Sequence, residues 1–353
     1  MNIFEAERLS AIKEYIPEDT HYTIRMDANE SFISLPSNIL DAFSAAVLSL
    51  DYNRYPDPFA TKVCARMAEY LGVPPDTITA GNGSDELISL LLGVLPGTHK
   101  KILMSAPDFA MYQFYAAAAE QEIITYGKDS PDFTLPVSQL LALAKKERPD
   151  VLIFSNPCSP TGQLMTREDI TELLSALPCT IVVDEAYGDF AGQSVLDLVG
   201  QYKNLVVLKT ASKAIGLAAL RLGFAVTHKE NTRVLRKIKS IYNVNTLTQT
   251  LGELVLSDTA YLKKAKEQIL ESCEMLYQGL CKIAERFPGF TVLKSAANFV
   301  FVRPRDAKTM QEALKKDGIC VRLMGGYLRI TCAKPEENAI VLERMAALCE
   351  LQK

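Results

Sequence analysis

The middle of the chain alternates short apolar runs with longer stretches of helical pattern. Seven apolar runs could form strands, at residues 77–80, 101–105, 122–125, 151–154, 180–183, 205–208 and 223–227. Helical stretches lie between many of them, such as 85–95, 137–146 and 167–176. Strands that are apolar on both faces, separated by helices, predict an α/β fold with a mostly parallel seven-stranded sheet covered by helices on both faces.

Near residue 246 the pattern changes to a mixture of helices and strands. Helices are expected at 247–256, 261–287, 308–316 and 335–350, strands at 291–293 and 299–302, and a hairpin over 319–331. This order is typical of a compact α+β unit. For a chain of 353 residues we therefore predict a large domain over residues 28–245 and a smaller α+β domain made of residues 1–27 and 246–353.

Composition narrows the class of protein. Hydrophobic residues make up 48% and charged residues 23% of the chain, as in soluble globular proteins, and the net charge of -4 favours neither nucleic acid nor a membrane as partner. The absence of a long uncharged apolar run and of a signal-like start predicts a cytoplasmic protein. Eight scattered cysteines and three histidines predict no metal site, and thiols that pack as small hydrophobic groups.

Polar residues directly follow several predicted strands, at the edge where parallel α/β sheets bind ligands. They are Ser84 and Asp85, Asn156, Asp184 and Tyr187, and Ser212 and Lys213, with Arg221 just before the last strand. We expect these side chains to converge on one edge of the sheet.

This set of side chains suits pyridoxal 5'-phosphate (PLP). PLP needs a lysine amine to bind it, a carboxylate at its pyridine nitrogen, and donors near its ring oxygen. Lys213, Asp184 and Tyr187 supply these three kinds of group. Free backbone N–H groups at a helix start after Gly83 would hold the phosphate, and Arg221 would add a cation.

Eight short stretches run in the same order as in a known family and cover nearly the whole chain. They are Asp27-Ala28-Asn29-Glu30, Tyr55-Pro56-Asp57, Gly83-Ser84-Asp85-Glu86, Asn156-Pro157 with Pro160-Thr161-Gly162, Val183-Asp184-Glu185-Ala186-Tyr187, Ser212-Lys213-Ala214 with Arg221, Tyr242-Asn243-Val244-Asn245 and Leu328-Arg329-Ile330-Thr331. The chain resembles the PLP-dependent aminotransferases of fold type I, and among them most closely the histidinol-phosphate aminotransferases.

The resemblance implies a role for each candidate residue. Lys213 would carry PLP and move the proton, Asp184 would pair with the pyridine nitrogen, and Asn156 and Tyr187 would contact the ring oxygen. Phe109 would stack on the ring, and the backbone of Ser84 and Asp85, with Ser212 and Arg221, would hold the phosphate. Arg329 would bind the anionic end of the substrate, which is an amino donor or a 2-oxo acid; we also expect Asn156 and, from the hairpin geometry below, Arg322 to contact it. Tyr55 would reach the cofactor of a neighbouring subunit, which makes the enzyme a homodimer.

Each residue also has a plain structural interpretation. A lysine after a strand is usually a surface residue, Asp184 or Ser84 could cap a helix, and Phe109 could be ordinary packing. Asn156 and Tyr55 could be turn residues beside proline. For Lys213, the position between the Asp-Glu-Ala-Tyr stretch and Arg221 favours the catalytic role.

The C-terminal hairpin places two arginines opposite each other. Gly325 and Gly326 suit a two-residue turn, because both central residues can adopt a positive φ. In that register Arg322 faces Arg329, and the two charges repel unless an anion lies between them. We therefore predict a site for a carboxylate or phosphate. The alternative is that both arginines extend into water.

Several departures from the family pattern concern the substrate more than the cofactor. The segment between Arg322 and Arg329 is shorter than usual, Lys209 stands in place of an arginine, Ala219 in place of a frequent glycine, and residues 29–32 lack a proline. The leading hypothesis is transamination between histidinol phosphate and 2-oxoglutarate. Alternatives are a broad aromatic or other amino-acid aminotransferase, a threonine-phosphate decarboxylase, and a non-catalytic ligand-sensing module of the same fold.

Overall fold

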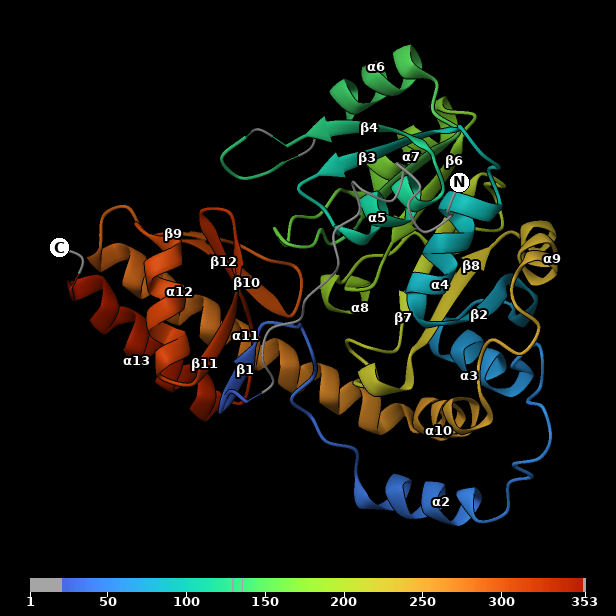
Figure 1. Ribbon diagram of the computed structural model, residues 1–353, viewed down its shortest axis with the longest axis horizontal. Coiled ribbons are helices and arrows are strands. Elements are labelled where there is room, and N and C mark those ends of the chain that lie inside the picture. The colour runs from blue at the N-terminus through green and yellow to red at the C-terminus, as the bar shows by residue number, and fades with distance from the viewer. Residues whose placement is uncertain (1–20, 129, 135, 352–353) are drawn as a thin grey trace, which may run out of the picture.

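The computed structural model describes residues 21–128, 130–134 and 136–351. Within these residues the chain forms a seven-stranded sheet, in the order β2-β8-β7-β6-β5-β3-β4, and a five-stranded sheet, in the order β1-β11-β12-β10-β9. Figure 1 shows the two sheets side by side, each with its own helices. The division into a large domain of residues 28–245 and a smaller domain of residues 1–27 and 246–353 remains a prediction. Residues 1–20 of the smaller domain lie outside the described range.

The large sheet contains all seven strands that the apolar runs predict. They are β2 (Ile78–Asn82), β3 (Lys101–Ala106), β4 (Glu122–Gly127), β5 (Val151–Ser155), β6 (Thr180–Asp184), β7 (Leu205–Thr210) and β8 (Leu222–Thr227). Neighbours among β3 to β7 pair in parallel, whereas β8 is antiparallel to both β2 and β7. The predicted α/β fold with a mostly parallel seven-stranded sheet is therefore confirmed.

Helices cover both faces of this sheet. One face packs against α3 (Thr61–Leu71), α6 (Val137–Glu147), α7 (Arg167–Ala176) and α10 (Thr246–Ser257). The other packs against α4 (Gly83–Ser89) with its π-helical continuation Leu90–Val94, α5 (Met111–Ala118) and α9 (Lys229–Ile238). Adjacent strand residues alternate between the faces, so that Val183 joins the first core and Val182 the second.

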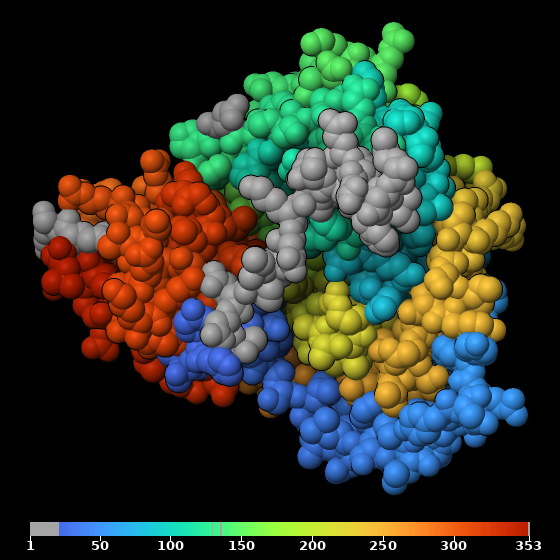
Figure 2. Space-filling model, viewed as in Figure 1, coloured from blue at the N-terminus to red at the C-terminus, as the bar shows by residue number. Residues whose placement is uncertain are grey.

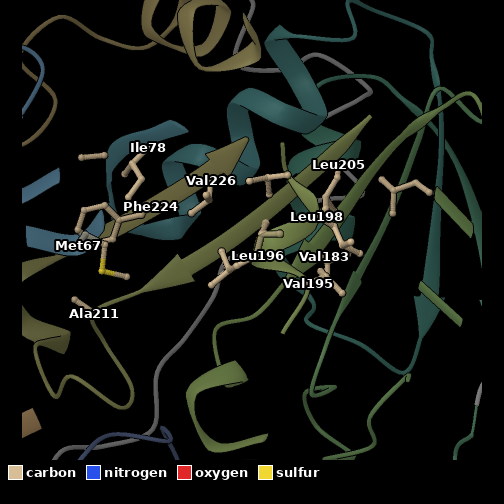
Figure 3. Packing of buried hydrophobic residues seen from close by; sticks show 14 of the residues in the cluster. Met67, Ile78, Val183, Val195, Leu196, Leu198, Leu205, Ala211, Phe224 and Val226 are labelled. Carbon is tan, nitrogen blue, oxygen red and sulfur yellow. The ribbon is translucent and has the colours of Figure 1, made fainter. Parts of the chain in front are cut away.

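Figure 3 shows part of the first core. Ile78, Val183, Leu205 and Phe224 come from four strands of the large sheet and belong to the same core as Leu196 and Leu198. These four side chains are fully buried. A sheet buried in this way holds its strand ends rigidly, which suits it to position a site.

The small sheet joins the two ends of the described chain. Its strands are β1 (Ile24–Met26), β9 (Thr291–Leu293), β10 (Phe299–Arg303), β11 (Ile319–Met324) and β12 (Tyr327–Thr331). It packs against α11 (Thr259–Arg286), α12 (Ala307–Lys316) and α13 (Pro335–Leu351). The strand β1 pairs in parallel with β11, which places the blue N-terminal residues beside the red C-terminal part in Figure 2.

Two further α-helices complete the described part of the chain. The helix α2 (Ser37–Val47) packs against α10 and lies at the lower edge of the molecule in Figure 1. The short helix α8 (Gly188–Ala191) follows Tyr187 directly. Among the described residues, no helix is long and apolar enough to cross a membrane.

The C-terminal hairpin has the register that its glycines predict. Arg322 pairs with Arg329, Leu323 with Leu328 and Met324 with Tyr327. Of the two turn glycines, only Gly325 has a positive φ, of 59°. The left-handed conformation is therefore adopted at the first central residue of the turn and not at Gly326.

The cysteines pack as expected. Seven of the eight cysteines are buried, and Cys281 is half-buried. Cys64, Cys179, Cys273, Cys332 and Cys349 pack as small hydrophobic side chains in the cores, whereas the buried Cys158 accepts a hydrogen bond from Lys128 Nζ at 3.0 Å.

Candidate active site

The reversed direction of β8 brings its beginning to the edge where the parallel strands end. Thr210, the last residue of β7, pairs with Gly223 near the start of β8. Lys213 follows β7 and Arg221 precedes β8, so both lie at the edge where β6 ends with Asp184. The predicted convergence of these residues on one edge therefore agrees with the observed topology.

The first turn of α4 and Arg221 lie in close contact, and we call them the cradle. Arg221 Nη2 donates a hydrogen bond to Asp85 Oδ2 at 2.8 Å. A Cβ added to Gly83, whose φ is +76°, would lie 2.8 Å from the same Nη2. A Cβ on Gly223 would lie 2.2 Å from the Ser84 backbone nitrogen, so only glycine allows β8 to approach the helix start this closely.

The donors of this cradle suit a phosphate. The first backbone N–H groups of a helix have no partner within the helix, and an adjacent guanidinium adds positive charge. Ser212 is buried just after β7, with its N–H donating to Thr210 Oγ1 at 3.2 Å. Residues 83–85, Ser212 and Arg221 thus fit the phosphate of PLP.

Asp184 is a buried carboxylate at the end of β6. It is 3% exposed, and its two oxygens accept hydrogen bonds from the Tyr112 hydroxyl at 2.7 Å and from the Ala186 N–H at 3.0 Å. Burial raises the pKa of Asp184 to about 6, although both hydrogen bonds lower it. A buried anion of this kind is stabilised by a cation placed beside it, and the protonated pyridine nitrogen of PLP is such a cation.

Lys213 and Tyr187 lie together on the same side of the site. Lys213 Nζ donates to the Ala28 carbonyl oxygen at 2.9 Å and lies 5.9 Å from the centre of the Tyr187 ring. The Tyr187 hydroxyl oxygen accepts a hydrogen bond from Asn29 Nδ2 at 2.7 Å. The lysine amine therefore lies beside a phenol that could donate a hydrogen bond to the ring oxygen of a cofactor bound to it.

The side-chain amide of Asn156 is held in one orientation. Its Oδ1 accepts from the Met165 N–H at 2.7 Å, and its Nδ2 donates to the Met165 carbonyl at 3.1 Å. The backbone N–H of Asn156 donates to the Asp184 carbonyl at 2.8 Å, which links the ends of β5 and β6. The second hydrogen of Nδ2 is compatible with the predicted contact to a ring oxygen.

Arg329 points from the small sheet to the large one. Its Nη2 donates to the Asp27 carbonyl at 2.6 Å, and its Nη1 donates to Ser159 Oγ at 3.3 Å in the loop after β5. The guanidinium also lies over the Phe299 ring, 5.5 Å from its centre. Since Arg322 is directly opposite on β11, the expected pair of arginines lies on one face of the hairpin.

Two aromatic candidates are exposed in the single chain. Phe109 is 36% exposed and meets the edge of Tyr112, with 5.5 Å between ring centres. Tyr55 is 80% exposed, and its ring stacks on Tyr242 at 4.4 Å. Stacked exposed rings of this kind favour contact with another molecule.

The structure adds residues that we did not select from the sequence. Tyr112 is fully buried and donates to Asp184, and the signal that could have found it is its place one helical turn after Phe109. Lys209 is buried beside Asp189, at 3.1 Å, and Glu185, at 3.6 Å. This lysine keeps the charge of the arginine usual in the family, and its ion pairs hold the turn that carries Tyr187.

Comparisons with known proteins agree with this geometry. Residues 23–345 match the family "Aminotransferase class I and II". Histidinol-phosphate aminotransferase of Clostridium novyi is 38% identical over 339 residues, which cover 94% of each chain. The enzyme of the same name from Carboxydothermus hydrogenoformans is 37% identical, with 97% of each chain covered.

Solved structures show the same fold. Histidinol-phosphate aminotransferase from Sinorhizobium meliloti, in complex with PLP, superposes with a TM-score of 0.87 at 22% identity and covers 99% of this chain and 98% of that one. L-threonine-O-3-phosphate decarboxylase from Porphyromonas gingivalis has a TM-score of 0.78 at 21% identity, with 94% of this chain and all of that chain covered.

The fold and the edge of polar residues define a fold-type I enzyme of amino-group chemistry. The chain belongs to the class I and II aminotransferase family, with histidinol-phosphate aminotransferases as near full-length relatives.

Proposed function

We propose that this chain transfers an amino group between histidinol phosphate and 2-oxoglutarate, in either direction, with PLP as its cofactor. The observation that carries the cofactor is the buried carboxylate of Asp184, which lies on the same sheet edge as Lys213 and the α4 cradle. The relatives named histidinol-phosphate aminotransferase, at 35–38% identity, support the substrate.

The residues at this edge of the sheet have separate roles in such a reaction. When bound, PLP withdraws electrons from the substrate carbon that carries the amino group. Asp184 keeps the pyridine nitrogen protonated, because an anion beside it stabilises the cation. Lys213 Nζ binds the cofactor and then moves the proton at the substrate carbon. Asn156 and Tyr187 would contact the ring oxygen, and Phe109 would cover the ring.

The substrates impose a second requirement on the arginine pair. Histidinol phosphate carries its negative charge on a phosphate, whereas glutamate and 2-oxoglutarate carry two carboxylates. One cationic site must therefore accept both kinds of anion in turn. Arg329 and Arg322 lie directly opposite each other on β12 and β11, and a guanidinium pair binds either anion through charge-assisted hydrogen bonds.

We also propose that the enzyme works as a homodimer in the cytoplasm. Tyr55 and Tyr242 stack on each other, and Tyr55 is 80% exposed in the single chain. Leu48 and Ile241, in neighbouring segments of the sequence, are exposed by 87% and 65%. Large exposed apolar side chains of this kind favour an interface. A second subunit would then receive Tyr55 at its phosphate cradle.

Other functions on the same fold make different demands. A threonine-phosphate decarboxylase would also use the cofactor and an anion site, and it shares the fold. A broad amino-acid aminotransferase would tolerate a neutral side chain and need only one arginine. A ligand-sensing module would not need Lys213. This chain has Lys213 together with Asp184, Tyr187 and the cradle at the start of α4.

A screen of amino donors against 2-oxo acids distinguishes these functions. Purified protein with PLP should convert histidinol phosphate and 2-oxoglutarate at least tenfold more efficiently than phenylalanine or tyrosine. Threonine phosphate should give no carbon dioxide. The Lys213→Ala variant serves as the matched control for contaminating activity. Faster turnover of aromatic amino acids, or release of carbon dioxide, would replace the proposed function by the corresponding alternative.

A further inference from the structure

Three consecutive residues of the N-terminal segment contact three residues of the site. The carbonyl of Asp27 accepts from Arg329 at 2.6 Å, and the carbonyl of Ala28 accepts from Lys213 at 2.9 Å. The side chain of Asn29 donates to Tyr187 at 2.7 Å. Asp27 and Ala28 contribute backbone carbonyls, whereas Asn29 contributes its side chain. Only the contact of Asn29 therefore depends on the type of residue in the N-terminal segment.

The orientation of the Asn29 amide follows from its other hydrogen bonds. The Asn29 backbone N–H donates to Thr331 Oγ1 at 3.0 Å. The Thr331 hydroxyl in turn lies 2.9 Å from Asn29 Oδ1, and since a carbonyl oxygen only accepts, the hydroxyl donates. With Oδ1 fixed toward Thr331, the NH₂ group of the amide must face Tyr187.

This orientation decides what the Tyr187 hydroxyl can do. An amide NH₂ has no acceptor atom, so Tyr187 Oη accepts this bond and its own hydrogen is available for another acceptor. We propose that Asn29 is a positioning residue that directs the Tyr187 hydroxyl to donate its hydrogen to the ring oxygen of bound PLP. A phenol that accepts one hydrogen bond also donates a stronger one.

The backbone at Asn29 restricts which residue can play this part. Asn29 is 1% exposed and has a φ of 54°, in the left-handed region that asparagine and glycine tolerate best. Its carbonyl also accepts from Asn298 Nδ2 at 3.3 Å, next to β10. Glycine would keep the backbone but lose the donor, and aspartate would keep the shape but offer only acceptors.

The inference rests on the proposed use of PLP and is tested on the bound cofactor. A donor at the ring oxygen stabilises its negative charge and so lowers the pH at which the absorption band of the lysine-bound cofactor titrates. Asn29→Asp offers an acceptor to Tyr187, which draws the hydroxyl hydrogen away from the ring oxygen. We expect the titration midpoint to rise by about one pH unit, the effect of losing one hydrogen bond.

A double-mutant cycle separates this effect from the added charge. The same Asn29→Asp change is made in a Tyr187→Phe background, where no hydroxyl exists to redirect. We expect a clearly smaller shift of the midpoint there, because only the added charge then acts, and an equal shift in both backgrounds would overturn the proposal. All four proteins share the charged groups around this network, which are Lys213, Arg329, Asp27 and Asp184. Their effects on the titration midpoint therefore cancel in the cycle.

A second pair of variants avoids a buried charge. Thr331→Val removes the hydroxyl that fixes Asn29 Oδ1, so the amide can rotate and present its oxygen to Tyr187. Its midpoint should rise in the Tyr187 protein and stay unchanged in the Tyr187→Phe background. Thr331→Ser keeps the hydroxyl and should match the unaltered enzyme. No effect of Thr331→Val would show that Asn29 only ties the two sheets together.

The dissociation constant of PLP, measured by equilibrium dialysis, gives an independent readout. It should increase severalfold in Asn29→Asp and not increase further when Tyr187→Phe is added. If the unaltered protein binds no PLP at all, the proposed cofactor is wrong. If it binds PLP and transfers amino groups while the two changes act additively, only the role of Asn29 is wrong.

Discussion

The buried carboxylate of Asp184 predicts how the stability of the cofactor-free enzyme depends on pH. Asp184 is 3% exposed, and burial raises its pKa from the ordinary value of 3.8 to about 6. Between these two pH values the folded protein holds a proton that the unfolded chain has lost. The contribution of Asp184 to stability is therefore fully present below about pH 4 and is lost as the pH rises through 6.

The size of the effect follows from the shift of the pKa. One pKa unit corresponds to about 1.4 kcal/mol, so a shift of this size changes the free energy of unfolding by about 3 kcal/mol. Asn has no titrating group, and Asp184→Asn should therefore lack this pH dependence. All other titrating groups are shared, so the difference in unfolding free energy between the two proteins isolates Asp184.

Urea unfolding of both cofactor-free proteins from about pH 3 to pH 8 measures this difference. Relative to Asp184→Asn, the unaltered protein should lose about 3 kcal/mol across this range, with most of the loss between pH 4 and 6.5. Tyr112→Phe removes a hydrogen bond that lowers the pKa of Asp184, so it should move the loss to higher pH. A difference that is constant with pH, or that grows in favour of the unaltered protein as pH rises, would refute the reasoning.

Three further predictions concern the reaction itself. Lys213→Ala should still bind PLP through the cradle but lose turnover by several orders of magnitude, and borohydride should fix PLP to Lys213 only in the unaltered enzyme. Arg329→Ala should raise KM for every anionic substrate by about 30- to 150-fold, because losing a charge-assisted pair costs roughly 2–3 kcal/mol. Arg322→Ala should raise KM for histidinol phosphate and 2-oxoglutarate more than for a neutral amino acid. Equal losses on all substrates would show that Arg322 has a structural role. Mixing Tyr55→Phe with Lys213→Ala subunits should restore one active site per mixed dimer, and no recovery after subunit exchange would exclude the shared site.

The sequence predicts the large sheet well, because its strands are apolar on both faces. The runs that form β5 to β8 are almost entirely buried, so hydrophobicity alone marks them. The helix α2 is different, since Ile39 is its only buried residue while Leu40 is 47% exposed. Its less exposed residues Ile39, Phe43, Ala46 and Val47 nevertheless recur at helical spacing, so this helix has the periodicity that predicts one, although we expected no helix there from the sequence. The strand β1 has three residues, and its partner lies at the other end of the chain.

The site shows the same division between local and distant information. Asp184, Lys213 and Arg221 could be placed because each is next to a strand end, which a single sequence displays. The contacts of Tyr112 with Asp184 and of Asn29 with Tyr187 join residues far apart in sequence. They depend on how α5 and the N-terminal segment pack on the sheet, and no spacing along the chain reports that.

The pairing of β1 with β11 has a consequence for the order of assembly. Ile24 meets Ile319, so this pairing closes a loop of almost the whole chain, whereas the strands of the large sheet lie within residues 78–227. Contacts between distant residues form late, because the entropy of closing a long loop opposes them. A chain leaving the ribosome carries the cradle and Lys213 well before residues 319–331 exist. The growing polypeptide thus acquires the edge that we propose for its cofactor before the hairpin that we propose for its substrate.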